Sequence, residues 1–529
     1  MKRSKIIRSI TKRWLGLKKI SQILKNFKIL PKQREVNVID YLIRKFLGKL
    51  DIGKDIVRLV GKDLISESLL RNIAANDIPN FYAEIATHMM SFGLQNDAAV
   101  MFETSLKLRH DDGVAINYLQ NLMCCSEKIY SQEKIYNITK NVMSKLAKVK
   151  TKSSHFNRLD ANRIINIGYT SHFFDNTTGT TLFLPIIKNH DRNRVKIFIY
   201  SDQNPEQTKL QTMKSADVWR DTHKMSDEEF CEIVRSDKID VMLELNGFCI
   251  LNRYRALNMR PAPVQVSFYN LSATSGVSEI DYVLVGEEVK TNHLQKFYTE
   301  KFFHKKGIQL ATEIGSHFPD VKNKIPFHQN GHITFGSFGQ AHKVSREQIF
   351  LWAKVLQKVE GSKFFMKANA LNGDGCVAAF KRHFSDAGID LSRVIFEGGS
   401  DYDKLLKCYE RVDVALDTYP YGAGTTTIEA LIQGTPVISL VGNNFCSQHG
   451  LINLRNVGHE ELICYSEAEF IKKAVDLAND PEEIERYRNV LRNDIASSER
   501  SNIKKYVKEL EDAYLEMFSI YAERQKISK

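Results

Sequence analysis

The sequence predicts an α/β fold class, with two Rossmann-type lobes preceded by an all-helical domain. Three observations support this prediction. From residue 163 onward, short β-branched runs alternate with helical patterns, which is typical of parallel sheets covered by helices. A polar stretch with two prolines, 316–331, separates these alternations into two sets. Before residue 150, Pro and Gly are sparse and apolar residues recur at helical spacing.

The 529 residues suffice for several domains with separate cores. In the first lobe we expect a helix near 182–187 and strands at 164–169, 195–200, 239–245, 264–269 and 282–285. In the second lobe we expect strands at 333–338, 363–366, 394–397, 412–416 and 436–441. The predicted domains are a basic amphipathic segment (1–34), a helical domain (35–155), two lobes (160–315 and 331–500) and a C-terminal helix (501–529).

One segment of the helical domain matches the pattern of a tetratricopeptide repeat. The small residues Ala86 and Ala98 of this segment would let two antiparallel helices approach closely. The following residues do not repeat the pattern, so a plain helical bundle is the alternative. Either arrangement indicates an interaction domain ahead of a catalytic body. The matching positions are Tyr82, Ile85, Ala86, Met89, Ala98, Phe102 and Ser105.

The basic excess of the chain is concentrated at its start. The formal net charge is +12, and twelve Lys and Arg residues precede the first acidic residue, Glu35, so 12 − 12 leaves the remainder near neutral. Ile6, Ile10 and Trp14 lie among these charges near helical spacing, which favours contact of residues 1–30 with an anionic membrane surface. Docking on the next domain, disorder and a mitochondrial presequence are the alternatives. The near-neutral body argues against nucleic-acid binding.

Composition indicates a soluble globular protein. Hydrophobic residues make up 43% of the chain and charged residues 26%, and no run of 18 apolar residues predicts a transmembrane helix. The eight cysteines form no CxxC pair and no zinc spacing, so we expect reduced thiols. The expected location is the cytoplasm, with association at the inner membrane face through the basic segment.

The stretch Val412 to Gly442 combines a strand, a glycine loop, a helix and a second strand. Its loop has Pro and Gly breakers, three threonines lead into the helix, and Gly434 stands where a C-cap glycine would stand. Unpaired N–H groups at the helix start, together with threonine hydroxyls, suit a phosphate, and Glu429 suits ribose hydroxyls. An ordinary βαβ unit is the equal alternative, because glycine loops are weak signals.

Four motifs follow one another between about Arg163 and Phe518, roughly two thirds of the chain. They are IGYTSHFF from Ile167, RPAPVQVSFYNLSATSG from Arg260, FGSFGQAHKV from Phe335, and the Thr425–Thr426 pair with its Gly434–Pro436 turn. Together they resemble the O-GlcNAc transferase and SPINDLY-like glycosyltransferase family, which also includes the HMW1C-type bacterial protein glycosyltransferases; the expected member is of the bacterial type.

The resemblance implies a GT-B-like pair of lobes behind a helical or tetratricopeptide domain. It implies inverting, metal-independent transfer of a sugar, of GlcNAc or glucose type, from a UDP-sugar to a protein side chain. No cofactor is expected beyond this donor substrate, and no metal. Lys343 is the expected catalytic cation, with His172 or Asp175 as candidate base. The residues expected to bind the nucleotide sugar are Gln340, Lys343, Gly424, Thr425, Thr426, Thr427 and Glu429.

Four histidines of the family pattern are absent. Their positions here are Thr177, Phe248, Leu405 and Gly424. Donor binding is therefore better supported than acceptor chemistry, which leaves two alternatives: transfer to a glycan or lipid-linked acceptor, or a non-catalytic partner of an active paralogue. The string Asp401-Tyr402-Asp403 spells DxD, but it begins a predicted helix and is interpreted as capping.

Overall fold

The computed structural model describes residues 78–146, 157–160, 162–174, 179–204, 210–249, 251–269 and 273–527. The predictions for residues 1–77, for Asp175 and for Thr177 lie outside this part of the chain. The chain folds into two compact units. Of the described residues, the first unit comprises those up to Cys125, Gln340–Gln357 and Met366–Gly399, and the second comprises those within Ser126–Gly339, Lys358–Phe365 and from Ser400 onward.

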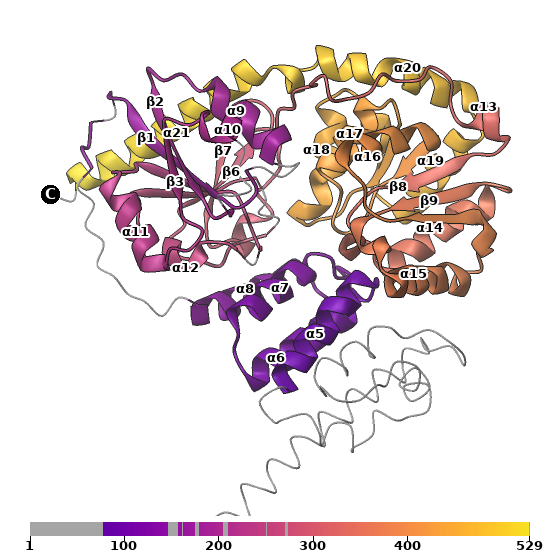
Figure 1. The fold of residues 1–529 in the computed structure, drawn as a ribbon, viewed down its shortest axis with the longest axis horizontal. Coiled ribbons are helices and arrows are strands. Elements are labelled where there is room, and N and C mark those ends of the chain that lie inside the picture. Colours follow the sequence, from indigo (N-terminus) through magenta and orange to yellow (C-terminus); the bar gives the residue numbers. More distant parts are fainter. Residues whose placement is uncertain are drawn as a thin grey trace, which may run out of the picture. The chain divides into compact units, whose positions relative to one another are not determined.

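A seven-stranded sheet forms the first lobe, which lies in the second unit (Figure 1). Its order is β3-β2-β1-β4-β5-β6-β7, and every neighbouring pair is parallel. This confirms the predicted parallel sheet. The strands are β1 (Ile165–Ser171), β2 (Val195–Ser201), β3 (Val218–Asp221), β4 (Val241–Glu244), β5 (Val264–Ser267), β6 (Tyr282–Gly286) and β7 (Lys301–Lys305).

The two edge strands of this sheet, β3 and β7, were not among the predicted strands. Their sequences, VWRD and KFFHK, carry charges because both strands are largely half-exposed. Buried central strands read instead as apolar runs. The helices of this lobe are α9 (Leu184–Asn189), α10 (Leu210–Met213), α11 (Asp227–Ser236) and α12 (Tyr254–Asn258), with a π-helical turn η1 (Gly179–Phe183) before α9.

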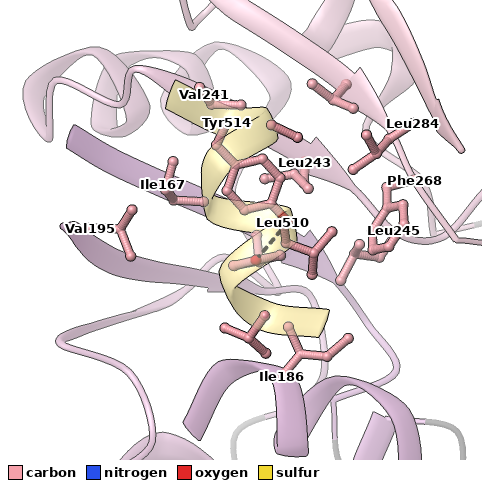
Figure 2. Packing of buried hydrophobic residues seen from close by; sticks show 14 of the residues in the cluster. Ile167, Ile186, Val195, Val241, Leu243, Leu245, Phe268, Leu284, Leu510 and Tyr514 are labelled. Atoms are coloured by element: carbon pink, nitrogen blue, oxygen red, sulfur yellow. Dashed lines mark hydrogen bonds between the residues drawn. The ribbon is translucent and has the colours of Figure 1, made fainter. Parts of the chain in front are cut away.

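The C-terminal helix α21 (Ile503–Ile527) completes the core of the first lobe. Figure 2 shows Leu510 and Tyr514 of α21 among side chains of the sheet, including Ile167 and Leu243. A buried hydrogen bond adds to this packing, because the Tyr169 hydroxyl lies 3.0 Å from the Tyr514 hydroxyl. The last helix therefore belongs structurally to a lobe formed by residues far earlier in the chain.

A six-stranded sheet forms the second lobe, with the order β10-β9-β8-β11-β12-β13. Its strands are β8 (Thr334–Ser337), β9 (Lys363–Lys367), β10 (Val394–Glu397), β11 (Val414–Leu416), β12 (Val437–Leu440) and β13 (Ile463–Cys464). The two-residue β13 was not predicted. The helices are α13 (Phe327–Asn330), α14 (Arg346–Lys358), α15 (Asp374–Asp386), α16 (Tyr402–Lys407), α17 (Thr425–Ile432), α18 (His449–Arg455), α19 (Glu467–Ala478) and α20 (Pro481–Ser497).

Three helices of the predicted helical domain lie in the first unit: α5 (Ile78–Ser91), α6 (Gln95–Leu108) and α7 (Asp112–Leu122). Ala86 and Ala98 are fully buried, which agrees with close packing of α5 and α6. The tetratricopeptide assignment and the domain boundaries remain predictions. The helix α8 (Gln132–Leu146) lies in the second unit.

Among the described helices, none combines the length and the apolar character that crossing a bilayer requires.

Candidate active site

The loop between β11 and α17 is shaped by a buried carboxylate. Asp417 Oδ1 accepts the backbone N–H groups of Thr418 (2.7 Å) and Ala423 (2.8 Å), and its Oδ2 accepts the Ser439 hydroxyl (2.7 Å). From α18, Asn453 donates to the Gly424 carbonyl at 2.9 Å. These bonds tie both ends of the loop to the second lobe and so fix the start of α17.

Helix α17 begins at the three threonines, and the following turn confirms the predicted cap glycine, since Gly434 has φ +72°. Gly424 is the N-cap residue and no side chain caps the helix there. Thr425 and Thr426 are half-buried, whereas the Thr427 hydroxyl is buried and donates to the Ala423 carbonyl at 2.8 Å. The first turn of α17 therefore retains backbone N–H donors and a positive dipole end.

A pocket of about 340 Å³, including open solvent, adjoins this helix start within the second unit. Three predicted site residues, Gly424, Thr425 and Glu429, line it together. The Tyr269 hydroxyl hydrogen-bonds Thr425, and burial raises the pKa of Tyr269 to about 12. The other lining residues are Thr181, Leu182, Leu310, Thr312, Phe318, Tyr402, Ile428 and Arg500.

Glu429 is a buried acid with one satisfied and one unsatisfied oxygen. Its side chain is 4% exposed, and Oε1 accepts the Tyr402 hydroxyl at 2.9 Å. Oε2 is buried without a hydrogen-bond partner. Burial raises the pKa of Glu429 to about 7, against the opposing effect of the nearby Tyr402 and Tyr409 hydroxyls. This acid is therefore divided between its two protonation states near neutral pH.

Arg500 is a pocket residue that the sequence analysis missed. It lies between α20 and α21, is 2% exposed, and its Nε donates to the Thr312 hydroxyl at 3.1 Å. Its Nη1 is buried without a partner. Burial lowers the pKa of Arg500 to about 10, so the guanidinium stays charged at pH 7. A lone arginine between two helices carries no local signal that would identify it.

Gln340 and Lys343 lie together in the first unit, whereas the pocket lies in the second. Gln340 is exposed and caps the short 3₁₀ helix η4 (Ala341–Lys343), and the Lys343 N–H donates to the Gln340 carbonyl at 2.9 Å. Between them, His342 has its pKa lowered to about 4 by burial and by the charge of Lys343. His342 is therefore uncharged at neutral pH.

The carboxyl ends of β1 and β4 hold His172, the candidate base. The Asn246 side-chain oxygen accepts the Ser171 hydroxyl at 2.8 Å and the His172 N–H at 3.2 Å. Cys249 Sγ lies 3.6 Å from Nε2 of the half-buried imidazole. Burial lowers the pKa of His172, so the neutral form that a base requires predominates near pH 7.

Two other predictions can be compared with the structure. Phe248, at a position where the family pattern has histidine, is 6% exposed and packs near Tyr254. Asp401 is the N-cap residue of α16 as expected, but its side chain makes no capping hydrogen bond. Within the described ranges, no group of three or more His, Cys, Asp or Glu residues is arranged to hold a metal ion.

The glycosyl transferase family 41 model matches residues 132–329 and 323–510. A relative from Hordeum vulgare, named probable UDP-N-acetylglucosamine–peptide N-acetylglucosaminyltransferase SPINDLY, is 28% identical over 377 residues, which cover 69% of this chain and 39% of that protein. A relative of the same name from Arabidopsis thaliana is 28% identical over 379 residues, which cover 69% of this chain and 40% of that protein. The chain thus spans about 40% of the length of these relatives.

Among solved structures, a lysine-to-methionine mutant of the Thermobaculum terrenum O-GlcNAc transferase matches with a TM-score of 0.80 and 25% identity, covering 87% of this chain and 88% of that one. The predicted resemblance and the two-lobed GT-B-like fold are both confirmed. With the family model matching well over half of its residues, the chain belongs to glycosyl transferase family 41.

Proposed function

We propose that this chain is a glycosyltransferase that moves a sugar of GlcNAc or glucose type from a UDP-sugar to a protein side chain, with inversion and without a metal. The pair of unsatisfied groups in the pocket carries the proposal: the buried Glu429 Oε2 lacks a donor and the buried Arg500 Nη1 lacks an acceptor. Leaving such groups unpaired costs about 1–3 kcal/mol each, and more for charged groups. A nucleotide sugar offers hydroxyls for the acid and diphosphate oxygens for the guanidinium.

The charge of the leaving UDP can be neutralised by groups of the protein itself. The dipole of α17 places partial positive charge at Thr425 and Thr426, and Lys343 adds a full cation by the role its motif implies. Charge-assisted hydrogen bonds of this kind are about twice as strong as neutral ones. These contacts supply the electrostatic stabilisation that a metal ion would otherwise provide, which supports the metal-independent mechanism.

The proposed step is a single displacement. The acceptor oxygen forms a bond to the anomeric carbon as the bond from that carbon to the β-phosphate oxygen breaks, and UDP leaves with the bonding electron pair. The proton of the acceptor passes to a base. The neutral imidazole of His172 is the candidate that the structure describes, and Asp175 remains the second candidate.

A protein acceptor is favoured over a glycan or a lipid-linked sugar. The names of the plant relatives specify a peptide acceptor, and helices α5–α7 precede the lobes in this chain. Labelled UDP-GlcNAc or UDP-glucose, incubated with the purified chain and cell extract, tests this choice. We expect label in protease-sensitive material. Label in protease-resistant polysaccharide alone contradicts it, and absence of turnover with every UDP-sugar supports the non-catalytic alternative.

Calorimetric titration with UDP tests the donor site. Lys343→Ala should weaken binding about 10- to 100-fold, since a hydrogen bond to a charged group contributes about 1.5–3 kcal/mol. Arg500→Met should weaken it by a similar factor. Arg488 provides a matched control, because it is equally buried at 2% exposure but donates to the Val412 carbonyl at 2.6 Å and does not line the pocket. Arg488→Met should lower thermal stability without selective loss of UDP affinity. Unchanged UDP affinity in both Lys343→Ala and Arg500→Met would refute the proposed donor site.

We also propose, from the sequence alone, that residues 1–30 attach the chain to anionic membranes. Each Lys or Arg near such a surface contributes about 1 kcal/mol. A variant starting at Val36 should keep transfer activity and lose binding to phosphatidylserine vesicles, and salt should weaken the binding of the full chain. Loss of folding or of all transfer activity in the variant contradicts this role.

A further inference from the structure

The turn between α5 and α6, residues 91–95, is bonded to the segments of the second lobe that belong to the first unit. The Arg346 N–H donates to the Gly93 carbonyl at 2.8 Å, and His383 Nε2 lies 2.8 Å from the Phe92 carbonyl. Cys376 Sγ donates to the Ser91 carbonyl at 3.2 Å. Consecutive carbonyls of the turn thus have partners on α14 and α15.

Gly93 shows how closely the turn approaches these segments. Its φ is +81°, a conformation that L residues with side chains rarely adopt. A Cβ atom at this position would lie 3.1 Å from the Val344 carbonyl oxygen and 3.4 Å from His383. The backbone of the turn therefore lies directly against the segment that follows Lys343.

Gln95, the first residue of α6, bonds the backbone on both sides of Lys343. It is 1% exposed, and its Nε2 donates to the His342 carbonyl at 2.8 Å and to the Val344 carbonyl at 3.3 Å. The backbone carbonyl of Gln95 is held in turn by Asn121, whose Nδ2 donates to it at 2.8 Å. One buried amide therefore spans the residue that is expected to bind the diphosphate.

We propose that Gln95 is a positioning residue for Lys343, so that helix α6 contributes to donor binding through this lysine. A lysine side chain is long and loses about 1.5–2 kcal/mol of rotational freedom when it is fixed. Immobilising the backbone on both sides of Lys343 keeps its Cα in place, so ligand binding has to order the side chain alone. This inference rests on the proposed donor-binding role of Lys343.

Gln95→Met tests the inference, because it keeps side-chain length and removes the amide donor. Ser105→Ala is the matched control: Ser105 is also on α6, is 1% exposed, and donates to the Pro79 carbonyl at 2.7 Å. Both variants should lose some thermal stability. Only Gln95→Met should weaken UDP binding, by about fivefold, as expected for one hydrogen bond, and raise KM for the UDP-sugar.

A double-mutant cycle separates positioning from general loss of structure. If Gln95 acts through Lys343, Gln95→Met should have no further effect on UDP affinity in the Lys343→Ala background. Equal weakening in both backgrounds, or unchanged affinity in Gln95→Met alone, overturns the inference while Lys343→Ala still binds UDP weakly. Unchanged affinity in Lys343→Ala would instead refute the proposed donor site itself.

Discussion

Two polar regions of the second unit differ in how their hydrogen bonds are satisfied. At the carboxyl edge of the first sheet, the groups that support His172 pair with one another: Glu244 accepts the N–H groups of Asn246 (2.8 Å) and Gly247 (3.0 Å), and Asn246 accepts from Ser171, although Thr170 Oγ1 and Ser267 Oγ on the same sheet are buried without a partner. In the pocket beside α17, the buried Glu429 Oε2 and Arg500 Nη1 remain unpaired.

The difference indicates different tasks. A set of internally paired groups holds its geometry without a ligand, which suits the orientation of one imidazole, that of His172. Unpaired buried groups are retained at a free-energy cost that a bound ligand can remove. The first region is therefore interpreted as a preorganised acceptor side and the second as a donor pocket completed by its substrate.

The largest expected effect is on the acceptor side. His172→Ala should lower kcat by about 10²–10⁴-fold, the usual contribution of general acid–base catalysis, while UDP affinity stays unchanged. Transfer rates and calorimetric titration measure the two quantities. His328→Ala is the control, since His328 is largely exposed and lies 3.1 Å from Glu485 at a helix end. Full activity of His172→Ala would assign the base to another residue.

The support of His172 provides a second test. Asn246→Leu removes the acceptor for two donors and should lower both kcat and the free energy of unfolding, by about 1–3 kcal/mol for each group left unpaired. Asn166 is the control at the opposite end of β1, where its side chain donates to the Asp237 carbonyl at 3.0 Å. Asn166→Leu should destabilise the chain without selective loss of kcat. Equal kcat in the two variants would show that the paired network only stabilises the fold.

UDP binding at the pocket should depend on pH through Glu429. Because the pKa of Glu429 is raised to about 7, the folded chain retains a proton that the unfolded chain loses near pH 4.5, and stability contributed by this group falls as pH rises through this window. A ligand hydroxyl donates to the carboxylate, so UDP affinity should rise with pH, by up to about tenfold per unit below pH 7. Glu429→Gln should abolish this slope in calorimetric titrations between pH 5.5 and 8. A slope that persists in the variant contradicts the role of Glu429.

The smallest effect is expected at Gly424, where the family pattern has histidine. Gly424 has φ −90°, and a Cβ atom there would meet nothing within 4 Å. Gly424→His should therefore change the free energy of unfolding by no more than about 0.5 kcal/mol, as most unstrained surface changes do. The added donor at the pocket should tighten UDP binding by about fivefold. A clear drop in the unfolding temperature of Gly424→His, or a tenfold loss of its UDP affinity, would contradict this expectation.

Central strands were predictable because they are buried on both faces and appear as apolar runs; β1, β2 and β12 lie within one or two residues of their expected bounds. The edge strands β3 and β7 were missed because partial exposure permits charged residues, and β13 because two residues form no pattern.

In the pocket, Gly424, Thr425 and Glu429 come from one local motif and were identified; Arg500 and Tyr402 were not assigned a role in binding.

The sequence alone determined the features that depend on neighbouring residues: two sets of alternating strands and helices, the threonines at the start of α17, and Gly434 with its positive φ. Only the tertiary structure decided which distant residues meet. It placed α21 in the core of the first lobe, Arg500 in the pocket with Glu429, and Gln95 on the backbone beside Lys343. The raised pKa of Glu429 also belongs to this second class, because it results from burial by residues that no local pattern specifies.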